Sequence, residues 1–91
     1  MSIWSIYLIR CDNDNLYTGI STDVNRRLKE HQSGGIKSAK YLRGKGPLKL
    51  MFQAEIGNRS EASIVEAKVK KLSHDKKELL IKGEYSLPLF S

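Results

Sequence analysis

Hydrophobic and polar positions follow a strand-like pattern in the first part of the chain. Residues 3–10 are rich in aromatic and β-branched side chains, and residues 16–20 form a second short run of this kind. Residues 12–15 between them are all Asp or Asn, which favour tight turns because their side chains bond their own backbone. The pattern predicts two strands joined as an antiparallel hairpin.

The spacing of apolar residues then changes to that of a helix. We expect a helix that begins after a capping residue within residues 21–23, runs to about residue 32 and ends at the glycine pair 34–35. Residues 34–47 hold four of the seven glycines and one proline, so we expect an exposed loop. The apolar run over residues 48–56 predicts a third strand.

Two more helices are predicted after this strand. A turn at residues 57–58 leads to Ser60, which we expect to cap a helix from residue 61 to about residue 72. Ser73 is expected to cap a last short helix over residues 74–82, which Gly83 closes.

The order strand-strand-helix-strand-helix-helix predicts an α+β domain, in which helices cover a small three-stranded antiparallel sheet. We place this domain at residues 2–82 and treat residues 83–91 as a C-terminal tail. A chain of 91 residues has room for one hydrophobic core.

The charge of the chain favours a polyanionic partner, most simply nucleic acid. Sixteen Lys and Arg against ten Asp and Glu give a net charge of +6. The single cysteine, Cys11, excludes an internal disulfide and a zinc finger. No apolar run reaches the length of a membrane span and no secretory pattern begins the chain, so we expect a cytoplasmic protein that does not bind membranes.

Two groups of lysine and arginine account for the positive charge. Residues 37–49 contain five basic side chains, no acidic one and two glycines, which suits a segment that follows a phosphate backbone. The alternative interpretation is that these basic side chains only form charged, solvent-exposed faces and bind no nucleic acid. The first group consists of Lys37, Lys40, Arg43, Lys45 and Lys49, and the second, on the last helices, of Lys68, Lys70, Lys71, Lys76 and Lys77.

Two tyrosines of the hairpin are candidates for chemistry. A connection that pairs Arg10 with Leu16 sets Tyr7 opposite Gly19 and places Tyr17 diagonally on the same face. Gly19 would then leave open space beside a phenol. A connection of even length would put the two rings on opposite faces, and two ordinary half-buried strand aromatics are the alternative interpretation.

Polar side chains on the helices add three candidates. Arg27 and His31 lie four residues apart on the inward face of the first helix, where an arginine needs an anion to offset its desolvation. The alternatives are an arginine that passes the edge of the core and a core histidine with its bonds satisfied. Glu66 lies at the margin of the apolar face of the second helix. There it can hold a divalent cation or pair with Lys70.

Taken together, these residues resemble the GIY-YIG nuclease superfamily, and in particular its short, stand-alone bacterial members. Residues 5–7 (S-I-Y) stand where the family has G-I-Y, and residues 17–19 (Y-T-G) where it has Y-I-G. The following helix carries the arginine and histidine of the family at Arg27 and His31. Glu66 matches the family's metal-binding glutamate. The chain departs from the pattern at Ser5 and has no asparagine after Asn58.

The resemblance implies a hydrolase that cuts phosphodiester bonds in DNA with one divalent metal, Mg²⁺ or Mn²⁺. Tyr7, aided by His31 or a water, would deprotonate the attacking water, and Arg27 and the metal would lower the pKa of its phenol. Glu66 would hold the metal, Arg27 and Tyr17 would bond phosphate oxygens, and Gly19 would let the substrate approach.

The resemblance also bears on the partners. The substrate is expected to contact the basic loop through Lys37, Lys40, Arg43 and Lys45, and cleavage is expected to follow DNA structure, as in repair or recombination. The alternative is a non-catalytic nucleic-acid-binding module on the same fold. A protein-interaction domain is a third interpretation. A protein partner or a second copy of the chain that supplies missing groups stays open.

Overall fold

A three-stranded antiparallel sheet forms the middle of the structure, as predicted. The computed structural model describes residues 2–34, 39–42 and 46–88. β1 (Trp4–Arg10) lies between β2 (Leu16–Ser21) and β3 (Lys49–Gly57), so β2 and β3 are the edge strands. The third strand starts and ends one residue later than the predicted range of residues 48–56.

The hairpin has the register that the odd-length connection predicts. Arg10 pairs with Leu16, and Tyr7 pairs with Gly19. The turn is closed by a bond from the Cys11 amide to the Asn15 carbonyl at 2.8 Å, and Asp14 adopts a left-handed conformation with φ of 68°. Asp tolerates this conformation better than most residues, which explains the acidic and amide side chains of the turn.

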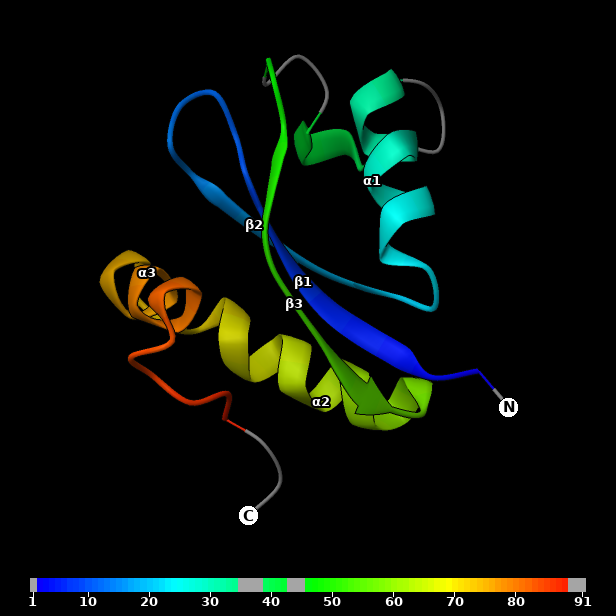
Figure 1. Ribbon diagram of the computed structural model, residues 1–91, viewed down its shortest axis with the longest axis vertical. Coiled ribbons are helices and arrows are strands. Elements are labelled where there is room, and N and C mark those ends of the chain that lie inside the picture. The colour runs from blue at the N-terminus through cyan, green and yellow to red at the C-terminus, as the bar shows by residue number, and fades with distance from the viewer. Residues whose placement is uncertain (1, 35–38, 43–45, 89–91) are drawn as a thin grey trace.

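Helices cover both faces of the sheet (Figure 1). On one face, α1 (Val24–Ser33) packs over Tyr7 and Ile9; Asp23 caps its N-terminus, and Gly34 ends it with φ of 68°. On the other face, α2 (Arg59–Lys70) and α3 (His74–Lys82) pack over Ile6 and Leu8. Because neighbouring residues of β1 point to opposite faces, the sheet separates an α1-face core from an α2-face core.

Two predictions about local structure are wrong. The cap of α2 is Asn58 rather than Ser60: the Asn58 side chain accepts a bond from the Glu61 amide at 2.8 Å, and Glu61 bonds back to the Asn58 amide at 3.0 Å. This reciprocal capping box starts the helix two residues earlier. The helix also ends at Lys70, before the predicted residue 72.

The predicted exposed loop is also more ordered than expected where the structure describes it. A 3₁₀ turn, η1 (Lys40–Leu42), interrupts it, and Leu42 and Leu48 are buried in the α1-face core. Further along, Tyr85 and Leu87 of the tail pack against the α2-face core. The domain boundary at residue 82 stays a prediction. Across the described residues, no helix has both the length and the apolar character needed to span a membrane.

Candidate active site

Three aromatic rings meet on the α1 face of the sheet, at the side of edge strand β2. Tyr7 comes from β1, Tyr17 from β2 and His31 from α1, and we call them the tyrosine cluster. The centroid of the Tyr17 ring lies 6.4 Å from that of Tyr7 and 5.5 Å from that of His31. Tyr7 and His31 are almost fully buried, at 2% and 1% exposed. The hairpin register and the inward face of α1 thus bring together three of the predicted residues.

Gly19 is required where Tyr7 lies. A Cβ atom at Gly19 would overlap the hydroxyl group of the Tyr7 phenol, because the two residues face each other across the hairpin. We expected open space above Gly19, and this is wrong: the Tyr7 ring fills that space. The missing side chain lets the phenol approach the backbone of β2 closely.

The hydrogen bonds of His31 fix which of its nitrogens carries a proton. The backbone amide of Ala39 donates to Nδ1 at 3.1 Å, so Nδ1 is an acceptor and has no hydrogen. Burial, and then the charge of Arg27, lower the pKa of His31 to about 4, so the ring is neutral at pH 7. Its one hydrogen is therefore on Nε2, which donates to the Tyr7 hydroxyl oxygen at 3.0 Å.

The protonation of Tyr7 differs from our expectation. Burial, and then the neighbouring Tyr17, raise the pKa of Tyr7 to about 12, while Arg27 lowers it by its charge and by a hydrogen bond. Burial likewise raises the pKa of Tyr17 above its ordinary value. The prediction that Arg27 brings the phenol below its ordinary pKa is wrong for the protein by itself, because burial outweighs the guanidinium.

Arg27 lies beside the cluster, as predicted. Its charge acts on Tyr7, Tyr17 and His31, and its guanidinium bonds Glu30 at 3.0 Å. The Glu30 side chain is only 24% exposed and offsets the charge of Arg27. The sequence gives no sign of this partner beyond its i,i+3 spacing.

Glu66 reaches the same edge of the sheet from the opposite face. It lies on α2, its side chain is 22% exposed, and it pairs with Lys70 at 3.6 Å, the alternative that the spacing predicts. Its negative charge nevertheless raises the pKa of both Tyr7 and Tyr17, so it acts within the cluster. One carboxylate that leaves room for water and phosphate oxygens fits Mg²⁺, and the exposed Lys70 amine is a weak competitor for it.

A second group of possible metal ligands has a different purpose. Asp14, His74 and Glu78 place ligand atoms within 4.8 Å of one another. However, Arg10 bonds both oxygens of Glu78 at 2.6 and 2.7 Å, and Asp14 at 2.7 Å. A guanidinium already balances these carboxylates, so the group ties α3 to the hairpin and is poorly suited to hold a metal.

The predicted basic loop is described only in part. Lys40 is exposed at the start of η1, and Lys49 is exposed at the start of β3. The other predicted contacts, Lys37, Arg43 and Lys45, lie outside the described residues.

Comparison with known proteins finds a matching family and similar chains. The GIY-YIG catalytic domain family matches residues 3–79. A UPF0213 protein from Cronobacter sakazakii is 54% identical over 92% of this chain and 86% of its own. The UPF0213 protein YhbQ from Escherichia coli O127:H6 is 54% identical over 89% of this chain and 79% of its own.

Two solved structures are also similar. The solution structure of a UPF0213 protein from Bacillus halodurans has a TM-score of 0.56 at 41% identity, over 90% of this chain and 85% of that one. The solution structure of a protein from E. faecalis has a TM-score of 0.62 at 32% identity, over 91% of this chain and 86% of that one.

Proposed function

This chain belongs to the GIY-YIG family of catalytic domains, and on that premise we propose that it is a metal-dependent endonuclease that hydrolyses DNA. The observation that carries the proposal is the convergence of Tyr7, Tyr17, Arg27, His31 and Glu66 at one edge of the sheet. Titratable side chains gathered at one edge of a sheet, with pKa values shifted by burial and by one another, are more typical of a catalytic or binding site than of a structural core.

The chain's own groups suit a phosphate whose charge increases during cleavage. Arg27 offers a cation and Tyr17 a hydroxyl group to non-bridging oxygens, beside the phenol of Tyr7. Glu66 is the residue that would hold Mg²⁺ or Mn²⁺, and a bound metal would supply a Lewis acid for the scissile phosphate.

The tautomer of His31 restricts how Tyr7 acts as a base. Because Nδ1 of His31 accepts from Ala39 and Nε2 donates to Tyr7, His31 has no free lone pair for the proton of the phenol. We infer that Tyr7 loses this proton to solvent and that His31 then stabilises the phenolate by its hydrogen bond. His31 is thus a positioning residue for Tyr7 in this proposal.

We also propose that DNA structure, rather than a long sequence, selects the cut, as in repair and recombination. The described part of the molecule measures only 37 × 33 × 18 Å. The full chain carries a net charge of +6. Basic side chains contact phosphates, which carry no sequence information. A cytoplasmic location stays a prediction.

The alternative of a non-catalytic binding module rests on a specific observation. Tyr7 and Tyr17 both have raised pKa values, so both are neutral phenols at pH 7, which suits binding as well as catalysis. The two functions differ in whether a bound strand is cut.

A cleavage assay tests the proposal. Fluorescent single-stranded, duplex, nicked and branched DNA, with matched RNA, would be incubated with Mg²⁺, Mn²⁺ or EDTA. We expect cutting that requires metal, falls at least a hundredfold in Glu66→Gln and in Tyr7→Phe, and persists in the control Glu55→Gln on β3. Binding without cutting on every substrate would favour the non-catalytic module. Cutting that survives in Glu66→Gln would refute the role of Glu66.

A further inference from the structure

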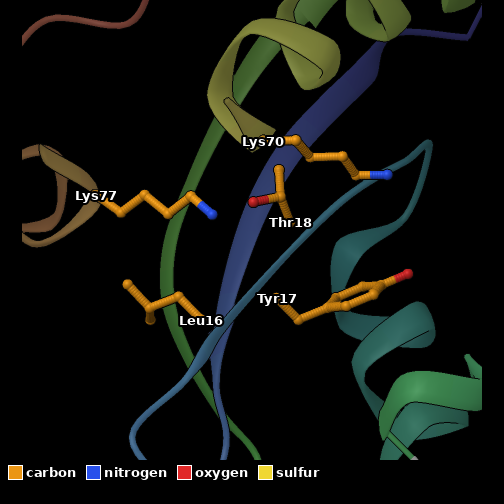
Figure 2. A pocket seen from close by; sticks show the side chains of 5 residues that line it. All are labelled: Leu16, Tyr17, Thr18, Lys70 and Lys77. Carbon is orange, nitrogen blue, oxygen red and sulfur yellow. The ribbon is translucent and has the colours of Figure 1, made fainter. Parts of the chain in front are cut away.

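A second polar site lies next to the tyrosine cluster, where β2 faces α2 and α3. A cavity of about 330 Å³ is lined by Leu16, Tyr17, Thr18, Lys70 and Lys77 (Figure 2). Tyr17 belongs to this cavity and to the tyrosine cluster alike. Figure 2 shows the Thr18 side chain between those of Lys70 and Lys77, with its hydroxyl oxygen on the side of the Lys77 amine.

Thr18 presents an unsatisfied polar atom at this cavity. The residue is 3% exposed, and within the described part of the chain its Oγ1 has no hydrogen-bond partner. A buried hydroxyl group without a partner is costly, so its presence calls for a ligand. A buried strand position between Leu16 and Ile20 on the same face would otherwise favour valine, which has nearly the same shape as threonine.

Lys77 adds a positive charge that the surrounding structure does not neutralise. It is partly buried, and both burial and the nearby charge of Lys70 lower its pKa. Among the described residues, no carboxylate forms an ion pair with Lys77, while the ion pair of Lys70 is the 3.6 Å contact with Glu66. Two amines that repel each other beside an unpaired hydroxyl group form a site for an anion.

We propose that Thr18, Lys70 and Lys77 bind a backbone phosphate of the nucleic acid, next to the phosphate held by the tyrosine cluster. This inference rests on the proposed function, because the neighbouring phosphate is the one to be cut. Tyr17 and Thr18 are consecutive in an outer strand and point to opposite faces, so a nucleic-acid strand that crosses this edge passes from one site to the other.

Binding without cleavage tests the site separately from the nuclease. A fluorescent single-stranded oligonucleotide would be titrated in EDTA at several salt concentrations, with anisotropy as the readout. We expect Thr18→Val to weaken binding about tenfold and Thr18→Ser to preserve it, because only valine removes the hydroxyl donor. Lys77→Gln should reduce the slope of log affinity against log salt by about 0.7, the value for one phosphate on a single strand.

Lys82→Gln is the matched control, since it removes the same charge from an exposed position of α3. If Lys77→Gln and Thr18→Val bind like Lys82→Gln and the wild type, the inference is wrong. Thermal unfolding shows whether the variants are folded; Thr18→Val should be at least as stable as the wild type, because it removes an unpaired buried group.

Inorganic phosphate distinguishes a strand phosphate from a free anion. In ¹⁵N-labelled protein, the oligonucleotide should shift the amide signals of Thr18 and Lys77 at lower concentration than inorganic phosphate does. Shifts caused by phosphate but not by the oligonucleotide would overturn the assignment to a nucleic-acid strand. If these variants weaken binding but no DNA is ever cut, the phosphate site stands and the nuclease proposal fails.

Discussion

The hydrogen bond from Ala39 to His31 determines which way a proton can move in the tyrosine cluster. Because this backbone amide occupies Nδ1, the imidazole donates to Tyr7 and does not accept from it. A histidine next to a tyrosine is easily taken for its base. At this position a backbone group, which sequence spacing does not reveal, assigns the histidine the opposite role.

The buried neutral state of His31 makes stability depend on pH. Its pKa falls from 6.5 to about 4 on folding, so the unfolded chain binds a proton that the folded protein refuses between these values. Stability is therefore full above pH 6.5 and is lost as the pH falls toward 4. We expect urea unfolding to show a loss of about 2 kcal/mol between pH 7 and pH 5.

The variant His31→Gln isolates this contribution, since it lacks the titrating group and should lose much less over the same range. An NMR titration of the His31 ring in the wild type gives a second measurement. A midpoint near 6.5 would show that burial does not hold the ring neutral.

Gly19 is the residue whose change should disturb the cluster most directly. In Gly19→Ala, the new methyl group overlaps the Tyr7 phenol and forces the ring away from its site. We expect a loss of about 1–3 kcal/mol in the free energy of unfolding, typical of overpacking, together with loss of cutting. In a Tyr7→Leu background the same change should cost less stability, because the overlapping atoms are gone. Equal costs in both backgrounds would contradict the overlap.

At the scale of elements, the capping box at the start of α2 gives a prediction that separates two candidate caps. Asn58→Ala removes the acceptor for the Glu61 amide and should destabilise the protein by about 1 kcal/mol, a fall in the melting temperature of about 4–8 °C. Ser60 is the second residue of the helix. Ser60→Ala should change the free energy of unfolding by less than about 0.5 kcal/mol. Thermal unfolding of both variants decides between them; the reverse order would restore Ser60 as the cap.

The elements that could be predicted from the sequence are those with a strong local signal. The hairpin follows from the turn residues, whereas the sequence leaves its register open between two connections. The odd-length connection, which places Tyr7 opposite Gly19, is the one that forms. The cap of α2 could not be decided, since Asn58 and Ser60 are both good capping residues and only the path of the chain selects one. The η1 turn and buried Leu42 lie in a glycine-rich segment without a period.

For the candidate site, the sequence could predict that these side chains come together, but it could not predict their protonation. The spacing of Arg27 and His31 on one helix face indicates that both point inward. The pKa of Tyr7 depends on how deeply the ring is covered, which involves side chains from several elements. The cavity at Thr18 and Lys77 was missed because its residues lie far apart in the sequence. The only signal was a threonine between Leu16 and Ile20 on one face of the strand.

At the scale of the whole molecule, the proposed site depends on both faces of the sheet. Tyr7, Tyr17 and His31 meet on the α1 face. Glu66 and the cavity lysines belong to α2 and α3, which lie on the other face of the sheet (Figure 1). Neither half therefore contains all of the groups that the proposed chemistry uses. The sheet between them fixes their separation, because β1 contributes side chains to both cores.

Cys11 has a practical consequence of its place in the α1-face core. The thiol is 4% exposed and belongs to the same buried cluster as Tyr7 and Leu42, and the sequence contains no other cysteine. A thiol reagent can react only while that core is transiently open, so the rate of labelling measures the opening equilibrium around the tyrosines. The labelling rate of the native cysteine therefore reports how often the core around the candidate site opens, without an engineered probe.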